Sequence, residues 1–314
     1  MVAMEFLETP DERFENLRDY PFEPHFQPVD AAGLRMHYLD EGPPDAAPIL
    51  MLHGEPSWSY LYRSMIPVGV AAGRRVIAPD LIGFGRSSKP TATGDYTYQR
   101  HCDWVQALIE ALDLRDITLV CHDWGSLIGL RLAAELEERF AGVVIGNGAL
   151  PDGNMGSVGL RGLPNMLVFL TWRTFARYWP RLPISGILQF GTRRELDAEE
   201  LRAYDAPFPD ERYKAGARAF PLLVPLSPRD PEIARNREAW KLLEHWQKPF
   251  LTAFSDGDPI TRGMDQLLQE RIPGARGLPH KTLSGGHFLQ EDSGPELVKL
   301  AVELSAVRTW SAHI

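Results

Sequence analysis

An acidic residue stands where a predicted strand turns into a predicted helix. The apolar run that begins at Ile117 ends in Cys-His-Asp-Trp-Gly-Ser, with Asp123 at the turn, and a helical pattern continues from Leu127. A sharp strand-to-helix turn can present its central side chain as a nucleophile. A carboxylate that attacks a saturated carbon forms an ester, which water must then cleave. The pattern predicts such two-step chemistry at Asp123, and an ordinary acidic helix N-cap is the structural alternative.

Cleaving such an ester requires a base, and histidine suits this task because it titrates near neutral pH. His287 lies in Ser-Gly-Gly-His-Phe-Leu, between the last predicted strand and the last predicted helix. An acid should orient the base and stabilise its cation. Asp256 and Asp258 both follow the preceding predicted strand, and we favour Asp258 because it lies deeper in the loop, before Pro259. Asp256 suits a turn position.

The sequence His-Gly-Glu-Pro-Ser-Trp, with Glu55 at its third position, follows an early buried strand. A loop at this place commonly supplies one backbone N–H of an oxyanion hole, and the residue after the nucleophile supplies the other. The amides of Glu55 and Trp124 are therefore the candidates. A buried carboxyl needs a partner, so we expect the Glu55 side chain to be hydrogen-bonded near the reacting groups. His53 is expected to be structural.

Predicted strands and helices alternate along the chain, and these elements must position the candidate residues. This alternation predicts the α/β class, with a mostly parallel, doubly wound sheet, and the order nucleophile, acid, histidine is that of the α/β-hydrolase fold. Strands are expected within 26–39 and at 48–52, 75–80, 117–122, 143–145, 250–254 and 281–283, and helices near 59–71, 98–112, 127–134, 233–246, 264–270 and from about 295.

Between residues 151 and 225 the alternation stops. Glycine, proline, arginine and aromatic residues are frequent there, the amphipathic segments are short, and no strand is predicted. We interpret this stretch as a helical cap inserted into a core formed by residues 1–150 and 226–314. Such a cap would cover the carboxyl edge of the sheet, where open α/β sheets bind ligands.

Composition excludes several classes of partner. The 314 residues carry a net charge of −9, which argues against binding to nucleic acid or to an anionic membrane surface. No signal peptide pattern or membrane-spanning apolar run is seen. The two cysteines, Cys102 and Cys121, indicate neither a disulfide framework nor a metal site. Glycines at 83 and 85 lack dinucleotide-loop spacing. We therefore expect a cytoplasmic protein without a metal or other cofactor.

The chain resembles the haloalkane dehalogenases in four motifs that occur in the family's order. Along the chain they read HGEPSW, DLIGFGRS, HDWGS and GGHFLQE, and the similarity extends from about Phe26 to Leu300, most strongly in the predicted core. The resemblance implies a hydrolase that converts a haloalkane to a primary alcohol, a halide ion and a proton. It also implies the family branch that has glutamate after His-Gly.

The same resemblance assigns roles to particular residues. Asp123 would be the nucleophile, His287 the base and Asp258 the supporting acid, while Glu55 and Trp124 would belong to the halide site. A second halide-binding tryptophan is implied in the cap, at Trp172, with Trp179 as the next choice. A departing halide needs donors in a dry pocket, and an indole N–H is such a donor.

Two other functions remain open from the sequence. An epoxide hydrolase could use the same aspartate but would assist an alkoxide with cap tyrosines, for which Tyr178, Tyr204 and Tyr213 are candidates; Trp124 beside the nucleophile argues against it. A non-catalytic binding protein of this fold would have a broken triad, whereas this triad is complete in sequence. Fold alone does not decide among the three.

Overall fold

The computed structural model describes residues 4–153 and 163–311 and is built around an eight-stranded sheet. The strand order is β10-β9-β8-β7-β4-β5-β3-β2, and neighbouring strands pair in parallel except at β3, which is antiparallel to both β5 and β2. Their bounds are β2 His25–Pro28, β3 Arg35–Glu41, β4 Pro48–Leu52, β5 Arg75–Pro79, β7 Ile117–His122, β8 Phe140–Gly146, β9 Phe250–Ser255 and β10 Lys281–Leu283. Separately, β1 (Phe6–Leu7) pairs with β6 (Lys89–Pro90).

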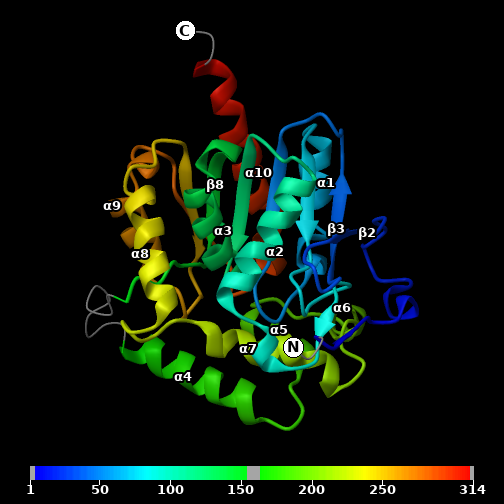
Figure 1. Ribbon diagram of the computed structural model, residues 1–314. Helices are drawn as coiled ribbons and strands as arrows, with labels where there is room; N and C mark the ends of the chain where they lie inside the picture. The colour runs from blue at the N-terminus through cyan, green and yellow to red at the C-terminus, as the bar shows by residue number, and fades with distance from the viewer. Residues whose placement is uncertain (1–3, 154–162, 312–314) are drawn as a thin grey trace.

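Helices cover both faces of the sheet (Figure 1). The first face carries α2 (Tyr98–Ala111), α3 (Trp124–Glu135) and α8 (Pro231–Leu243), and the opposite face carries α1 (Ile66–Ala71) and α10 (Leu289–Ser311). A further helix, α9 (Met264–Arg271), precedes β10. Every residue of β4, β7 and β8 is buried, because these central strands are covered on both sides.

In the described part of the chain between β8 and α8, four α-helices are inserted, and together with their loops we call them the inserted helical region. They are α4 (Leu163–Tyr178), α5 (Ile184–Gly191), α6 (Ala198–Asp205) and α7 (Ala215–Leu223). The region lies beyond the carboxyl ends of the parallel strands, at the bottom of Figure 1. The α/β-hydrolase fold predicted from the alternation is confirmed.

Two predicted helices differ from those observed. The stretch 59–71 is divided into a 3₁₀ turn, Ser59–Tyr62, and α1, because the Ser59 amide donates to the carboxylate of Asp80 at 2.7 Å and Pro67 opens the second helix. The last helix begins at Leu289 rather than near Pro295, and its first turn is set off by the non-helical backbone of Ser293. Among residues 4–153 and 163–311, no helix combines the length and apolar character needed to cross a membrane.

Candidate active site

Asp123 occupies the sharp turn between β7 and α3. Its backbone adopts φ 49° and ψ −126°, a conformation that non-glycine residues rarely take. The turn fits only because its neighbours are small: a Cβ on Gly125 would lie 1.9 Å from the Leu52 carbonyl oxygen, and a Cβ on Gly54 would lie 2.2 Å from Oδ1 of Asp123. The predicted turn therefore places the aspartate side chain directly beside the loop that follows β4.

The structure brings the three predicted triad residues together. Nε2 of His287 lies 3.6 Å from Oδ2 of Asp123, and Nδ1 of His287 lies 3.2 Å from Oδ1 of Asp258. Asp258 and His287 are 2% and 7% exposed. The side chain of Asp123 is 23% exposed and lies on the wall of a cavity. The imidazole thus stands between one buried carboxylate and one that a small molecule can reach.

The two aspartates after β9 have different surroundings. Asp258 accepts hydrogen bonds from the backbone amides of Ile260 and Thr261, at 2.9 and 3.1 Å, and from the Thr261 hydroxyl. Asp256 is half exposed and forms an ion pair with Arg193. The preference for Asp258 as the partner of the histidine agrees with this geometry.

Charge and burial oppose each other in the triad. Burial alone would lower the pKa of His287, but the carboxylates of Asp258 and Asp123 together raise it to about 10. Burial would raise the pKa of both aspartates, yet the imidazolium of His287 outweighs it, and both values lie below the ordinary range. The resting site therefore holds two carboxylates and one imidazolium at neutral pH.

Glu55 contributes its backbone and its side chain to this site. Its amide donates a 2.8 Å hydrogen bond to Oδ1 of Asp123, and the Trp124 amide also stabilises that carboxylate. The Glu55 side chain is buried and lines the cavity, but among the described residues its Oε1 has no hydrogen-bond partner, contrary to the partner expected. The pKa of Glu55 is raised well above its ordinary value, mainly by burial and to a lesser extent by the nearby charge of Asp123.

A mostly apolar cavity of about 390 Å³ opens onto Asp123. Trp124 forms part of its wall from the core and Trp172 from α4, whereas Trp179 is half exposed and lies in a different groove, on α4. The wall is completed by aromatic and aliphatic side chains from both parts of the fold, among them Phe169, Ile187, Phe190, Pro221, Val224 and Phe288.

The three cap tyrosines do not line this cavity. Tyr178 is 68% exposed and lies in the groove with Trp179. Tyr204 is buried and donates its hydroxyl to Glu291, and Tyr213 packs against the hydrophobic core. The side chains that an epoxide hydrolase would need are thus directed to other contacts.

Sequence reasoning missed two residues that support the histidine. Asn147, directly after β8, donates from its side chain to the carbonyl oxygens of Gly286 and His287, both at 2.9 Å. Its own backbone carbonyl accepts from the Asp123 amide at 3.1 Å. His122 shares a 2.8 Å hydrogen bond with the His287 carbonyl. An asparagine between two glycines after a buried strand was the available signal for the first.

Comparison with known proteins agrees with the fold and identifies the family. Residues 47–293 match the family described as the alpha/beta hydrolase fold, which fixes the class of protein. A haloalkane dehalogenase of Psychrobacter cryohalolentis is 54% identical over 306 residues, covering 96% of this chain and 98% of that protein. Haloalkane dehalogenase 1 of Mycobacterium bovis is 55% identical over 299 residues, covering 94% and 97%. The chain belongs to the haloalkane dehalogenase family.

Solved structures give the same result. The haloalkane dehalogenase DpaA of Paraglaciecola agarilytica superposes with a TM-score of 0.87 at 34% identity, covering 96% of this chain and 98% of that one. DatA of Agrobacterium tumefaciens superposes with a TM-score of 0.74 at 29% identity, covering 95% and 99%. The family and the enzyme class predicted from the four motifs, a hydrolase acting on carbon–halide bonds, are confirmed.

Proposed function

We propose that this chain cleaves haloalkanes through a covalent alkyl ester on Asp123, giving a primary alcohol, a halide ion and a proton. The observation that carries the proposal is the placement of Asp123 on the wall of an apolar cavity, facing His287, which in turn faces the buried Asp258. A carboxylate is a sufficient nucleophile for a saturated carbon, and the histidine is needed only to cleave the ester.

In the first step, an oxygen of Asp123 bonds to the carbon of the substrate while the carbon–halogen bond breaks and the electron pair leaves with the halide. The indoles of Trp124 and Trp172, on the core and inserted sides of the cavity, hold the departing ion. Their shared location around Asp123 supports this assignment, and the separate location of Trp179 argues against the second choice. Donors aimed at developing charge act most strongly in a site without water.

In the second step, His287 takes a proton from water, whose oxygen attacks the ester carbonyl carbon. The imidazolium of the resting site first loses its proton to solvent once Asp123 is alkylated. Hydrolysis then releases the alcohol, restores the carboxylate and leaves His287 protonated again. The ester carries no charge, so the alkylated enzyme lacks one of the two carboxylates that raise the pKa of His287. Alkylation therefore moves the imidazole toward the neutral form that can act as a base.

Glu55 serves this second step as well as the first in our proposal. Its amide is placed to stabilise the oxyanion that forms on Asp123. Its carboxyl, whose raised pKa favours the neutral form and whose Oε1 has no hydrogen-bond partner among the described residues, can hold the water or the halide. We propose on this basis that the chain belongs to the family branch with glutamate in the His-Gly-Glu-Pro loop.

We further propose that residues 151–225 act as the cap and that residues 1–150 and 226–314 form the core. The cap helices supply Trp172 and several apolar cavity walls, so they determine the size of the halogenated alkane that binds. Small ligands commonly occupy cavities of about 300–1,000 Å³, which includes this one. A cytoplasmic location stays a prediction, supported by two cysteines that remain unpaired and buried.

Halide release from a panel of primary bromoalkanes and chloroalkanes, measured beside one aliphatic epoxide, tests the proposed function. We expect release of bromide or chloride with formation of the alcohol, no diol from the epoxide, and no turnover by Asp123→Ala. Diol formation without halide release would instead establish the epoxide-hydrolase alternative.

A further inference from the structure

Residues 191–194, at the end of α5 and the start of its connection to α6, lie directly against the loop that carries His287. The carbonyl oxygen of Gly191 accepts a 3.0 Å hydrogen bond from the amide of Phe288. On the other side of the histidine, a Cβ on Gly286 would lie 2.4 Å from the same carbonyl oxygen. The residues before and after His287 therefore both contact the inserted helical region. This support for the histidine loop comes from outside the parallel sheet.

The carboxylate of Asp292 joins these two segments. Its Oδ2 accepts from the amides of Gly286 and Arg193, at 2.8 and 3.0 Å, and its Oδ1 accepts from the amide of Arg194 at 2.8 Å. Three backbone N–H groups from two distant segments thus converge on one carboxylate. Hydrogen bonds to an ionised acceptor are stronger than those between neutral groups.

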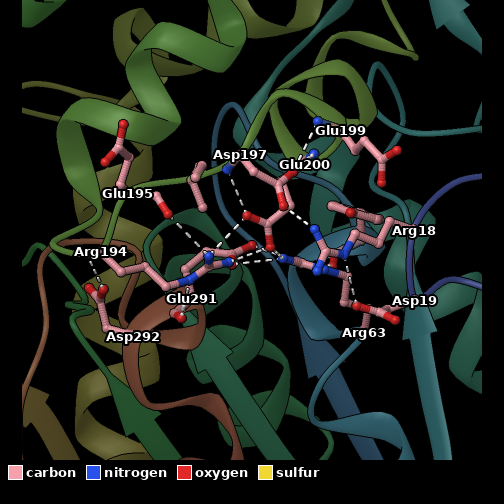
Figure 2. Close-up of polar contacts among 12 residues, drawn as sticks. Arg18, Asp19, Arg63, Arg194, Glu195, Asp197, Glu199, Glu200, Glu291 and Asp292 are labelled. Atoms are coloured by element: carbon pink, nitrogen blue, oxygen red, sulfur yellow. Dashed lines mark hydrogen bonds and ion pairs between the residues drawn. The ribbon is translucent and has the colours of Figure 1, made fainter.

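A network of charged side chains supports the turn that carries Asp292 (Figure 2). Glu291 forms a two-point ion pair with Arg63, at 2.6 and 2.9 Å, and also contacts Arg194. Glu200 of α6 bonds both arginines, each at 2.7 Å. The side chains of Arg63 and Glu291 are 6% and 2% exposed, so solvent screens their pairing little. The first turn of α10 is thereby fixed to the core and to the inserted helical region.

We infer that Asp292 is a positioning residue for His287. By tying Gly286 to residues 193–194, it sets where the imidazole stands between the nucleophile and the supporting acid. This inference rests on the proposed function, in which His287 acts in ester hydrolysis but not in carbon–halogen cleavage. Asp292 therefore acts on the second step alone, and a displacement of about 1 Å can reduce a rate on the order of 10²-fold.

Rapid-quench measurements with a primary bromoalkane separate the two steps. Bromide release reports alkylation of Asp123, alcohol formation reports hydrolysis, and intact-protein mass spectrometry reports the adduct. We expect Asp292→Ala to slow hydrolysis by roughly 10-fold or more, to change alkylation by less than about 3-fold, and to accumulate adduct. Asp292→Asn keeps the shape and one carbonyl acceptor, so it should restore part of the hydrolysis rate. If the alanine variant does not fold, the asparagine variant decides the question.

Glu200→Gln is the matched control, because it weakens the same junction while Arg63 keeps its ion pair with Glu291. We expect this variant to lower the thermal midpoint and to leave the ratio of the two rates unchanged. Asp292 variants that slow both steps equally, or that lower only the thermal midpoint, would overturn the positioning role. Failure of the proposed function itself would be recognised separately, since the wild-type enzyme would then release no bromide.

Discussion

Nε2 of His287 lies 3.6 Å from Oδ2 of Asp123, close enough for strong attraction between charges but beyond a hydrogen bond of ordinary length. The charge on the carboxylate therefore acts on the protonation of the imidazole. In the proposed mechanism the first step removes that charge, so alkylation of Asp123 would favour the neutral imidazole that acts as the base in the second step.

This relationship predicts a shift in the titration of His287. In the free enzyme it should titrate near pH 10, and Asp123→Ala, which removes one carboxylate as alkylation does, should lower the pKa. Proton NMR of the histidine ring across a pH series measures both values. An unchanged pKa in Asp123→Ala would show that the two groups are not coupled.

The same raised pKa predicts how stability depends on pH. The contribution of His287 is complete below its ordinary pKa of about 6.5 and is lost as pH rises through the folded value, because only the unfolded chain releases the proton in between. The difference in unfolding free energy between wild type and His287→Phe should therefore shrink from pH 6.5 to 10. Urea unfolding at several pH values tests this, and a growing difference would contradict it.

Replacing His287 with phenylalanine should separate the two steps. Alkylation needs no base but ester cleavage does, so the variant should release about one equivalent of halide and retain the alkyl group. Mass spectrometry of the intact protein should show the added mass. A folded variant that carries no adduct after exposure to substrate would count against the roles given to Asp123 and His287.

Asp258→Asn should lower turnover on the order of 10²-fold or more, because the imidazolium loses the charge of its buried partner. In the wild type that carboxylate accepts four hydrogen bonds, including the one from His287. Asp256→Asn should have a far smaller effect, since Asp256 is half exposed and pairs with Arg193. Steady-state halide release from the two variants, with circular dichroism to verify folding, ranks them. The reverse ranking would identify Asp256 as the supporting acid.

Trp124→Phe and Trp172→Phe should each weaken halide binding and slow carbon–halogen cleavage, on the order of 10²–10³-fold for the loss of one donor. Bromide or iodide should quench the tryptophan emission saturably in the wild type and less in each variant. Trp179→Phe is the control, because its side chain lies in a separate groove. Loss of halide binding in the control alone would move the cap donor to Trp179.

Glu55→Gln should retain most activity, because glutamine resembles the neutral carboxyl that burial and Asp123 favour. Glu55→Ala should lose more, since it removes the polar group from the cavity wall while leaving the backbone amide in place. Halide release from both variants gives the comparison. Equal losses would mean that an ionised Glu55 is required.

The sequence was sufficient to predict the elements whose patterns are local. Buried strands such as β4 and β7 are continuous apolar runs, and the turn at Asp123 follows from a strand that meets a helix without a loop. The partners of His287 were harder to predict, because Asn147 and residues 191–194 reach it only through the tertiary fold. The surroundings of the Glu55 carboxyl were harder to predict for a similar reason, since a rule that buried carboxyls need partners does not identify one whose pKa is raised at a cavity wall and whose Oε1 has no partner among the described residues.

The contact between residues 191–194 and the histidine loop limits how this enzyme can be recombined with its relatives. Exchanging the helices that line the cavity is an obvious route to a different substrate range. Yet Asp292 bonds to amides that precede it by 98 and 99 residues, within the segment that such an exchange would replace. A chimera that keeps residues 191–194 of this chain changes the walls of the cavity and preserves the segment that Asp292 bonds. A chimera that takes residues 191–194 from a relative also changes the segment that holds the loop of His287.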